Sequence, residues 1–398
     1  MSARLEGVVP ASVAHASAAT HAVTRVSSID ILRGLVMVLM ALDHVRDFFT
    51  DVRFDPLDLA QTNAPLFLTR WITHFCAPTF VLLVGISAYL TGRHCTRAQL
   101  SWFLFTRGLW LVVLEVTLMS LVWTFNVRYD NGLFLQVIWA IGVSMMVLAV
   151  LVHSSLRTIA VFSMVIICGH NLLDHIEPQN FGAWAPLWSL LHVSGPIPHA
   201  FVAYPLIPWI AVMSLGYCFG ALFDTDPQQR KQWLICSGAA SLTAFVLLRM
   251  TNLYGDPTHW SLQATTLQTL LSFVNVHKYP PSLLYLLLTL GSGLLLLAAF
   301  ESARGKLSEV LRTFGRVPLF FYVMHIALAH LVAGIIALAM GYGTALLSDD
   351  FMKVPQQWGF ALPVVYLAWA LAIATLYPAC RWFAAVKRRR DDWWLSYL

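Results

Sequence analysis

Residues 25–49 read RVSSIDILRGLVMVLMALDHVRDFF, and this stretch decides the fold class. Its middle, 35–42, is an unbroken run of eight apolar residues, as in a helix that crosses a bilayer. Charged and titratable residues flank the run: Asp30 and Arg33 before it, and Asp43, His44, Arg46 and Asp47 after it. Charged groups are costly in hydrocarbon. We therefore expect this helix to face a protein interior or a water-filled cavity.

The spacing places several of these groups on one helical face. Arg33 and His44 are eleven residues apart, which is about three turns and roughly 16 Å of helix rise. Asp43 and Arg46 are three residues apart and can pair beside that face. Asp47 lies three residues past His44 and can reach the imidazole by the same spacing. A stripe with a permanent cation, an imidazole and carboxylates favours a functional site over lipid contact.

The composition is that of a polytopic membrane protein. Hydrophobic residues make up 58% of the chain and charged residues 11%, against about 25% charged in soluble proteins. The first apolar stretch lacks the short core and cleavage site of a signal peptide, so we expect it to stay in the protein. The six scattered cysteines predict free thiols. The net charge of +5 does not indicate nucleic acid, because the basic residues lie mostly in short loops and at the tail.

Apolar segments of roughly membrane-spanning length recur along the chain. We predict ten: 31–49, 72–91, 100–123, 133–152, 158–173, 203–223, 233–248, 282–300, 317–340 and 360–383. The predicted fold is an all-α, polytopic integral membrane protein of about ten transmembrane helices.

The remaining segments complete the predicted domain organisation. Residues 1–24 are expected to form a disordered N-terminal tail. Residues 25–386 would form a single membrane domain, and 387–398 a basic and aromatic cytoplasmic tail. Apolar and polar patterning in the long connections at 184–193 and 262–274 predicts interfacial helices. Lys and Arg gather in alternate short connections, which predicts that both termini are cytoplasmic.

His44 is the leading candidate for chemistry, because an imidazole can act as a general base near neutral pH. Glu115 is the second candidate, since it lies in the apolar run 109–121 and must find a partner or be protonated. It would orient His44, as a carboxylate does in a catalytic triad, or form an ion pair that holds helices together. Asp43 and Asp47 compete for the orienting role, and an ordinary cluster of charges at a helix end fits them equally well.

Other polar residues are candidates for the same site. His74 opens the second span and would lie level with His44, although a capping histidine fits as well. Tyr322 and His325 are three residues apart and share a face of the ninth span. Lys278 would bind an anionic acceptor or snorkel to the membrane interface. We expect no metal site, because no two of the outer histidines have the i, i+4 spacing of a ligand pair.

Several motifs resemble those of the transmembrane acyltransferase superfamily. The pattern S-I-D-I-L-R-G-x(9)-H at 28–44, with an Arg eleven residues before a His, resembles the first helix of the acyltransferase-3 family. The SIDxLRG opening, the DHVRD that follows, YPLIPWI at 204–210 and KYPPSLLY at 278–285 resemble the bacterial branch of the heparan-α-glucosaminide N-acetyltransferase-like proteins. The lysosomal heparan enzymes carry their catalytic histidine in the first luminal loop, whereas 50–70 contains none here.

The resemblance implies a bacterial inner-membrane acyltransferase. It would transfer an acetyl or acyl group from cytoplasmic acetyl-CoA or acyl-CoA to a sugar hydroxyl or amine of an envelope glycan. The co-substrate would be acyl-CoA, and we expect neither a bound cofactor nor a nucleic-acid partner. The protein could be a monomer or a homo-oligomer. His44 would be the base, with Glu115, Asp47 or Asp43 orienting it. Arg46 would bind the acceptor. The phosphates of the donor would be bound by Arg33 with Arg93, Arg97, Arg107 and Arg316. The other predicted substrate-binding residues are His74, Lys278, Tyr322 and His325.

Two other classes of protein fit the intramembrane charges. Arg33, His44, Glu115 and His325 would also suit a proton-coupled transporter of a small solute. A secondary transporter often has two related halves with matching broken helices, and the sequence shows no such repeat. An accessory subunit would use the same residues only to assemble its helices.

Overall fold

The computed structural model describes residues 26–126, 132–348, 354–390, 392 and 395. The predicted tail 1–24 lies outside the described residues, as does part of 387–398. In chain order the helices are α1 (Ser27–Phe49), α2 (Ala64–Ile72), η1 (Thr73–Phe75), α3 (Cys76–Gly92), α4 (Arg97–Leu114), η2 (Glu115–Met119), α5 (Ser120–Thr124), α6 (Val137–Leu151), α7 (Leu156–Gly169), η3 (His170–Leu173), η4 (Pro178–Trp184), α8 (Ala185–Leu191), α9 (Leu206–Gly220), η5 (Ala221–Asp224), α10 (Pro227–Thr251), α11 (Thr266–Val274), α12 (Leu283–Phe300), α13 (Lys306–Arg316), α14 (Pro318–Ala339), α15 (Ala345–Ser348) and α16 (Leu362–Arg389).

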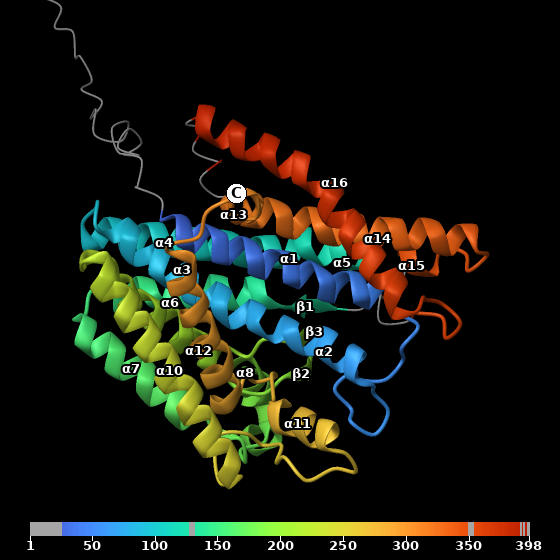
Figure 1. Cartoon of the computed structure of the whole chain (residues 1–398), viewed down its shortest axis with the longest axis horizontal. Coiled ribbons are helices and arrows are strands. Elements are labelled where there is room, and N and C mark those ends of the chain that lie inside the picture. Colours follow the sequence, from blue (N-terminus) through green and yellow to red (C-terminus); the bar gives the residue numbers. More distant parts are fainter. Residues whose placement is uncertain (1–25, 127–131, 349–353, 391, 393–394, 396–398) are drawn as a thin grey trace, which may run out of the picture.

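The long helices form a bundle (Figure 1). Within the described residues, eight helical segments are long and apolar enough to cross a membrane: Ala64–Gly92, Arg97–Thr124, Leu156–Leu173, Leu206–Asp224, Pro227–Thr251, Leu283–Phe300, Pro318–Ala339 and Leu362–Arg389. The protein is therefore a polytopic α-helical membrane protein, as predicted. The other two predicted spans are also helical, but α1 carries five Asp and Arg side chains and α6 has only 15 residues.

Helix α1 is the centre of the contact network that builds the site. It packs against α3, α12, α13, α14 and α16. Its apolar side chains are buried there, including Ile31, Leu32, Met37 and Ala41. Trp369 of α16 donates its indole N–H to the backbone carbonyl of Val38, 2.9 Å away. Because protein surrounds α1, its charged residues can meet partners away from lipid.

Two of the spans change helix type near the site. The second span passes from α2 to α3 through a short 3-10 segment, η1, which contains His74. The third passes from α4 to α5 through a π-helical segment, η2, which begins at Glu115. π-helical insertions are rare and frequently occur at functional sites. Both changes occur at polar residues within spans that are mostly apolar.

A small sheet lies among the connections and was not predicted. Its strands are β1 (Leu133–Leu135), β2 (Gly195–Ile197) and β3 (Ala200–Val202), in the order β1-β3-β2. Strand β3 pairs with β1 in parallel and with β2 antiparallel. The helices after β1 and β3 therefore begin at Val137 and Leu206, later than the predicted 133 and 203. Apolar strands of three residues cannot be distinguished from a helix start by hydropathy alone.

Helix α13 was also not predicted, and it crosses α1 at very close range. Two glycines form the crossing. A Cβ atom on Gly34 would lie 1.8 Å from the backbone oxygen of Leu311. One on Gly315 would lie 1.9 Å from the backbone oxygen of Asp30. The crossing therefore requires glycine on both helices.

Replacing Gly34 by Ala is expected to destabilise the protein by about 1–3 kcal/mol, the usual cost of overpacking. The new methyl group would push α13 away from α1, because the clash is with backbone that cannot move aside locally. The measurement is thermal unfolding in detergent. Gly169→Ala is the matched control, since a Cβ there would meet no atom within 4 Å. Equal unfolding temperatures for the two variants would contradict this account of the crossing.

Candidate active site

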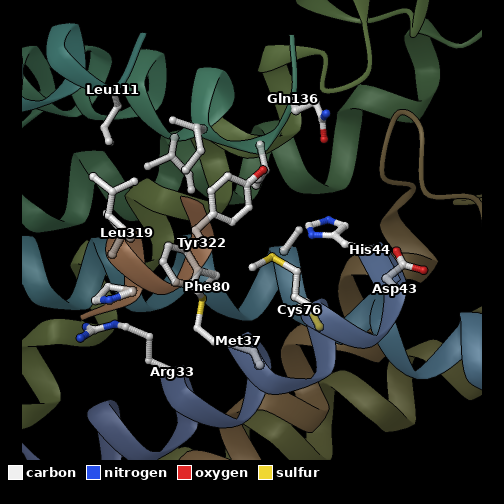
Figure 2. A pocket seen from close by; sticks show the side chains of 18 of the residues that line it. Arg33, Met37, Asp43, His44, Cys76, Phe80, Leu111, Gln136, Leu319 and Tyr322 are labelled. Atoms are coloured by element: carbon white, nitrogen blue, oxygen red, sulfur yellow. The ribbon is translucent and has the colours of Figure 1, made fainter. Parts of the chain in front are cut away.

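A cavity of about 1380 Å³ runs beside α1 (Figure 2). One end, which we name the Arg33 end, is lined by Arg33, Ser87, Arg107, Arg316, Lys387 and Arg388. The other, the His44 end, is lined by Asp43, His44, Arg46, Asp47, Arg70, Tyr204, Lys278 and Tyr279. Apolar side chains line the length between them, among them Met37, Phe80, Leu111 and Leu319. Arg33 and His44 thus share one cavity, as their spacing on α1 suggested.

His44 is hydrogen-bonded to a second histidine from α14. Its Nδ1 lies 2.7 Å from Nε2 of His325. The Nδ1 of His325 lies 2.8 Å from the backbone oxygen of Phe321. A carbonyl oxygen can only accept, so this Nδ1 carries the proton of a neutral His325, and its Nε2 must accept from His44.

The tautomer of His44 follows from this chain of bonds. With the proton on Nδ1, its Nε2 holds a free lone pair, and none of the described hydrogen bonds uses that lone pair. Trp123 contacts the imidazole edge to face, with ring centroids 5.0 Å apart. Tyr322 contacts it in the same manner at 6.0 Å. Figure 2 shows His44, Cys76 and Tyr322 around the same space. His44 is therefore held in the form that can accept a proton from a molecule in the cavity.

The carboxylates nearest His44 in sequence bind arginines. Asp43 lies 2.9 Å from Arg46 and 2.5 Å from Arg70, so it bridges two spans. Asp47 lies 2.6 Å from Arg46. The predicted pair of Asp43 with Arg46 is present. The predicted contact of Asp43 or Asp47 with the imidazole is not present. His325 forms the hydrogen bond to the imidazole instead. Successive helix residues point about 100° apart, which turns Asp43 away from the ring.

The Arg33 end is rich in cations. Arg33 donates to Asp30 at 3.2 Å, to Ser87 at 2.9 Å and to the backbone oxygen of Gly315 at 3.1 Å. Arg316 lies 3.9 Å from Asp30. These contacts fix Arg33 at the junction of α1, α3 and α13.

A family comparison identifies the class of protein to which this chain belongs. The family model described as "Heparan-alpha-glucosaminide N-acetyltransferase, catalytic" matches residues 25–253, more than half of the chain. The chain belongs to this family. It is thus a membrane acetyltransferase of the heparan-α-glucosaminide N-acetyltransferase family, as the sequence motifs suggested. Among curated proteins, none matches the sequence. The matched range includes Arg33, His44 and Glu115, whereas Lys278 and His325 lie beyond it.

Glu115 of the acetyltransferase has a partner that was not predicted. Its Oε1 accepts the backbone N–H of Gln136, at 3.0 Å, just before α6 begins. The first N–H groups of a helix lack partners within the helix and favour a negative group. Its Oε2 is buried with no hydrogen bond in the described part of the chain. Neither the predicted ion pair between helices nor the predicted bond to His44 is therefore formed by Glu115 among the described residues.

His74 does not line the cavity of the acetyltransferase. It is buried, and neither ring nitrogen has a hydrogen-bond partner among the described residues. Two of the cations that were predicted to bind the phosphates of acetyl-CoA also do not line the cavity. Arg93 pairs with Asp224 at 3.0 Å, and Arg97 donates to the backbone oxygen of His153 at 2.9 Å, so both are directed away from the cavity.

Several lining residues of the acetyltransferase were missed at the sequence level. Lys387 and Arg388 were assigned only to the cytoplasmic tail, yet both line the Arg33 end. Tyr204 and Tyr279 line the His44 end. These two tyrosines lie in the YPLIPWI and KYPPSLLY motifs, so the motifs were the signal that could have found them. No group of three or more His, Cys, Asp or Glu side chains suited to a metal occurs among the described residues.

Proposed function

We propose that this protein transfers an acetyl group from acetyl-CoA, bound at the Arg33 end, to a hydroxyl or amine of a sugar acceptor at the His44 end. The observation that carries the proposal is a cavity that is lined by Arg33 at one end and by His44 at the other. Arg33 and His44 are separated by roughly 16 Å of helix rise. An extended pantetheine arm covers a distance of this order, and apolar side chains line the intervening wall.

The residues around His44 support a direct transfer. Nε2 of His44 would take the proton from the acceptor hydroxyl or amine as that atom attacks the thioester carbonyl carbon. The carbon–sulfur bond then breaks, and coenzyme A leaves as its thiol with the proton from the imidazolium. Nε2 of His325 accepts the Nδ1 proton of His44, so it keeps the ring oriented and stabilises its charged form.

The cations of the Arg33 end would bind the phosphates of the donor. Arginine donates paired N–H groups that match phosphate oxygens, and such charge-assisted bonds are stronger than neutral ones. Arg33, Arg107 and Arg316 would supply these donors, together with Lys387. The bias of Lys and Arg in short connections supports a cytoplasmic position for this end. We propose that the protein lies in a bacterial inner membrane with both termini in the cytoplasm.

Replacing Arg33 by Ala is expected to raise KM for acetyl-CoA about 10- to 150-fold, because a hydrogen bond to a charged group contributes about 1.5–3 kcal/mol. The measurement is acetyl-CoA binding and slow hydrolysis by the purified full chain in detergent. Arg97→Ala is the matched control, since Arg97 is directed away from the cavity. Failure of the folded wild-type protein to bind acetyl-CoA would end the donor proposal and favour transport assays.

A further inference from the structure

The loop 275–282, which joins α11 to α12, contributes Lys278 and Tyr279 to the wall of the His44 end. Lys278 is only 8% exposed. Its ammonium lies 5.0 Å from the centre of the Tyr279 ring, so the chain is folded against its neighbour. A buried lysine in the cavity wall beside the proposed base is placed to bind a ligand, rather than to snorkel to a membrane interface.

Buried polar anchors hold this loop in place. The carboxylate of Asp256 accepts the backbone N–H of His277 at 2.8 Å and the hydroxyl of Ser282 at 2.7 Å. Arg249 donates to the backbone oxygen of Asn275 at 2.7 Å, and also to Phe273, Thr258 and Ser272. Lys278 is therefore positioned before any ligand binds, which lowers the entropic cost of binding.

The charges at the His44 end do not balance. Arg46 binds Asp43 and Asp47, and Arg70 binds Asp43. Lys278 is hydrogen-bonded to the phenol of Tyr279 but forms no ion pair within the described ranges, so three cations face two carboxylates. An uncompensated buried charge is costly unless a counter-ion or a hydrogen-bonding group meets it. The site therefore favours a ligand that brings one negative charge.

The phenol of Tyr279 lies in the positive electrostatic field of these cations. Burial raises the pKa of this phenol, but Lys278 and Arg70 outweigh burial and hold the pKa below its usual value. The phosphates of coenzyme A cannot supply the missing charge in the proposed binding mode, because they would lie at the Arg33 end. The negative group must come from the other substrate.

We propose that Lys278 binds a carboxylate or phosphate of the acceptor, so that the preferred acceptor is an acidic sugar. This inference rests on the proposed function, because it assumes that the acceptor enters at the His44 end. The anion would bind between Lys278 and the Arg70 side chain, with the reacting hydroxyl or amine directed at Nε2 of His44. A neutral sugar would leave the charge of Lys278 uncompensated and bind more weakly.

The test is binding of three sugars to the full chain in detergent, followed by thermal unfolding. Saturating coenzyme A fills the Arg33 end, so that anions report on the His44 end. The probes are glucosamine, which has no acidic group, glucosamine 6-phosphate, which has a phosphate, and muramic acid, which has a carboxylate. All three carry the same amine. We expect at least one acidic sugar to bind at least tenfold more tightly than glucosamine. Lys278→Met should abolish this preference, and Lys278→Arg should keep it.

Each result separates the two proposals. Equal binding of the acidic sugars and of glucosamine to the wild type, or a preference that survives in Lys278→Met, would overturn the role of Lys278. Tighter binding of only one acidic sugar would identify the anion as phosphate or carboxylate. Hydrolysis of acetyl-CoA by the wild type, measured on the same preparation, reports on the proposed function by itself. A protein that hydrolyses acetyl-CoA but shows no preference among the sugars would lose only the inference about Lys278.

Discussion

Replacing His44 by Gln is expected to lower the rate of acetyl transfer by about 10²- to 10⁴-fold, the usual contribution of a general base. Gln can still donate a hydrogen bond toward His325, but its amide cannot take a proton from the acceptor. Acetyl-CoA should still bind, because the cations that would hold its phosphates lie at the Arg33 end. The measurement is kcat for acetyl transfer or slow acetyl-CoA hydrolysis, together with the dissociation constant for acetyl-CoA.

The matched control is His94→Gln, which changes an exposed histidine just after α3. It should leave both constants unchanged. If His44→Gln keeps the wild-type rate, His44 is not the base. If the variant instead changes the pH dependence of solute flux in vesicles, the result favours the proton-coupled transporter. A loss of thermal stability without any other effect would point to a structural role.

The position of His44 could be predicted from the sequence, but its partner could not. The eleven-residue spacing from Arg33 was sufficient to place both side chains along one cavity. The partner, His325, is 281 residues away. Sequence spacing identifies neighbours three or four residues apart on the same helix, so it pointed to Asp47. Nothing in a single sequence reports which face of α14 packs against α1.

The same limit explains the ion pairs. Asp43 and Arg46 are one helical turn apart, and their pair was predicted. Arg70, the third member, comes from a different span and lies 2.5 Å from Asp43. Glu115 was expected to find an ionic or histidine partner or to be protonated, because it lies in an apolar run. It binds the backbone N–H of Gln136 instead, and backbone donors have no residue-type signal in a sequence.

Hydropathy predicted the long helices because a spanning helix must be apolar over many residues. It failed for α13, which carries Glu309, Arg312 and Arg316 and therefore lacks an apolar run. It also failed for β1, whose three residues continue the apolar pattern of α6. The close crossing of α1 and α13 depends on Gly34 and Gly315. Glycine is common in membrane helices, so these two were not distinctive.

Replacing Asp43 by Asn is expected to destabilise the protein by about 3–5 kcal/mol, the usual cost of breaking a buried ion pair from one side. Asp43 is the shared partner of Arg46 and Arg70. Arg46 would keep Asp47, but Arg70 has no second ion pair in the described part of the chain. The loss comes mainly from leaving the Arg70 charge buried and uncompensated. The measurement is the unfolding temperature and the yield of folded protein in detergent.

The control is Asp47→Asn, which should cost far less. The side chain of Asp47 is 35% exposed, against 12% for Asp43, and among the described residues Asp47 has an ion pair only with Arg46. Water can therefore replace part of the hydrogen bonding that Asp47 gives to Arg46. Exposed ion pairs typically contribute about 0–1 kcal/mol to stability. The double variant Asp43→Asn with Arg70→Gln should regain part of the stability, because it removes the uncompensated charge. If the Asp43 and Asp47 variants are equally stable, Asp43 does not hold the second span to α1 through Arg70.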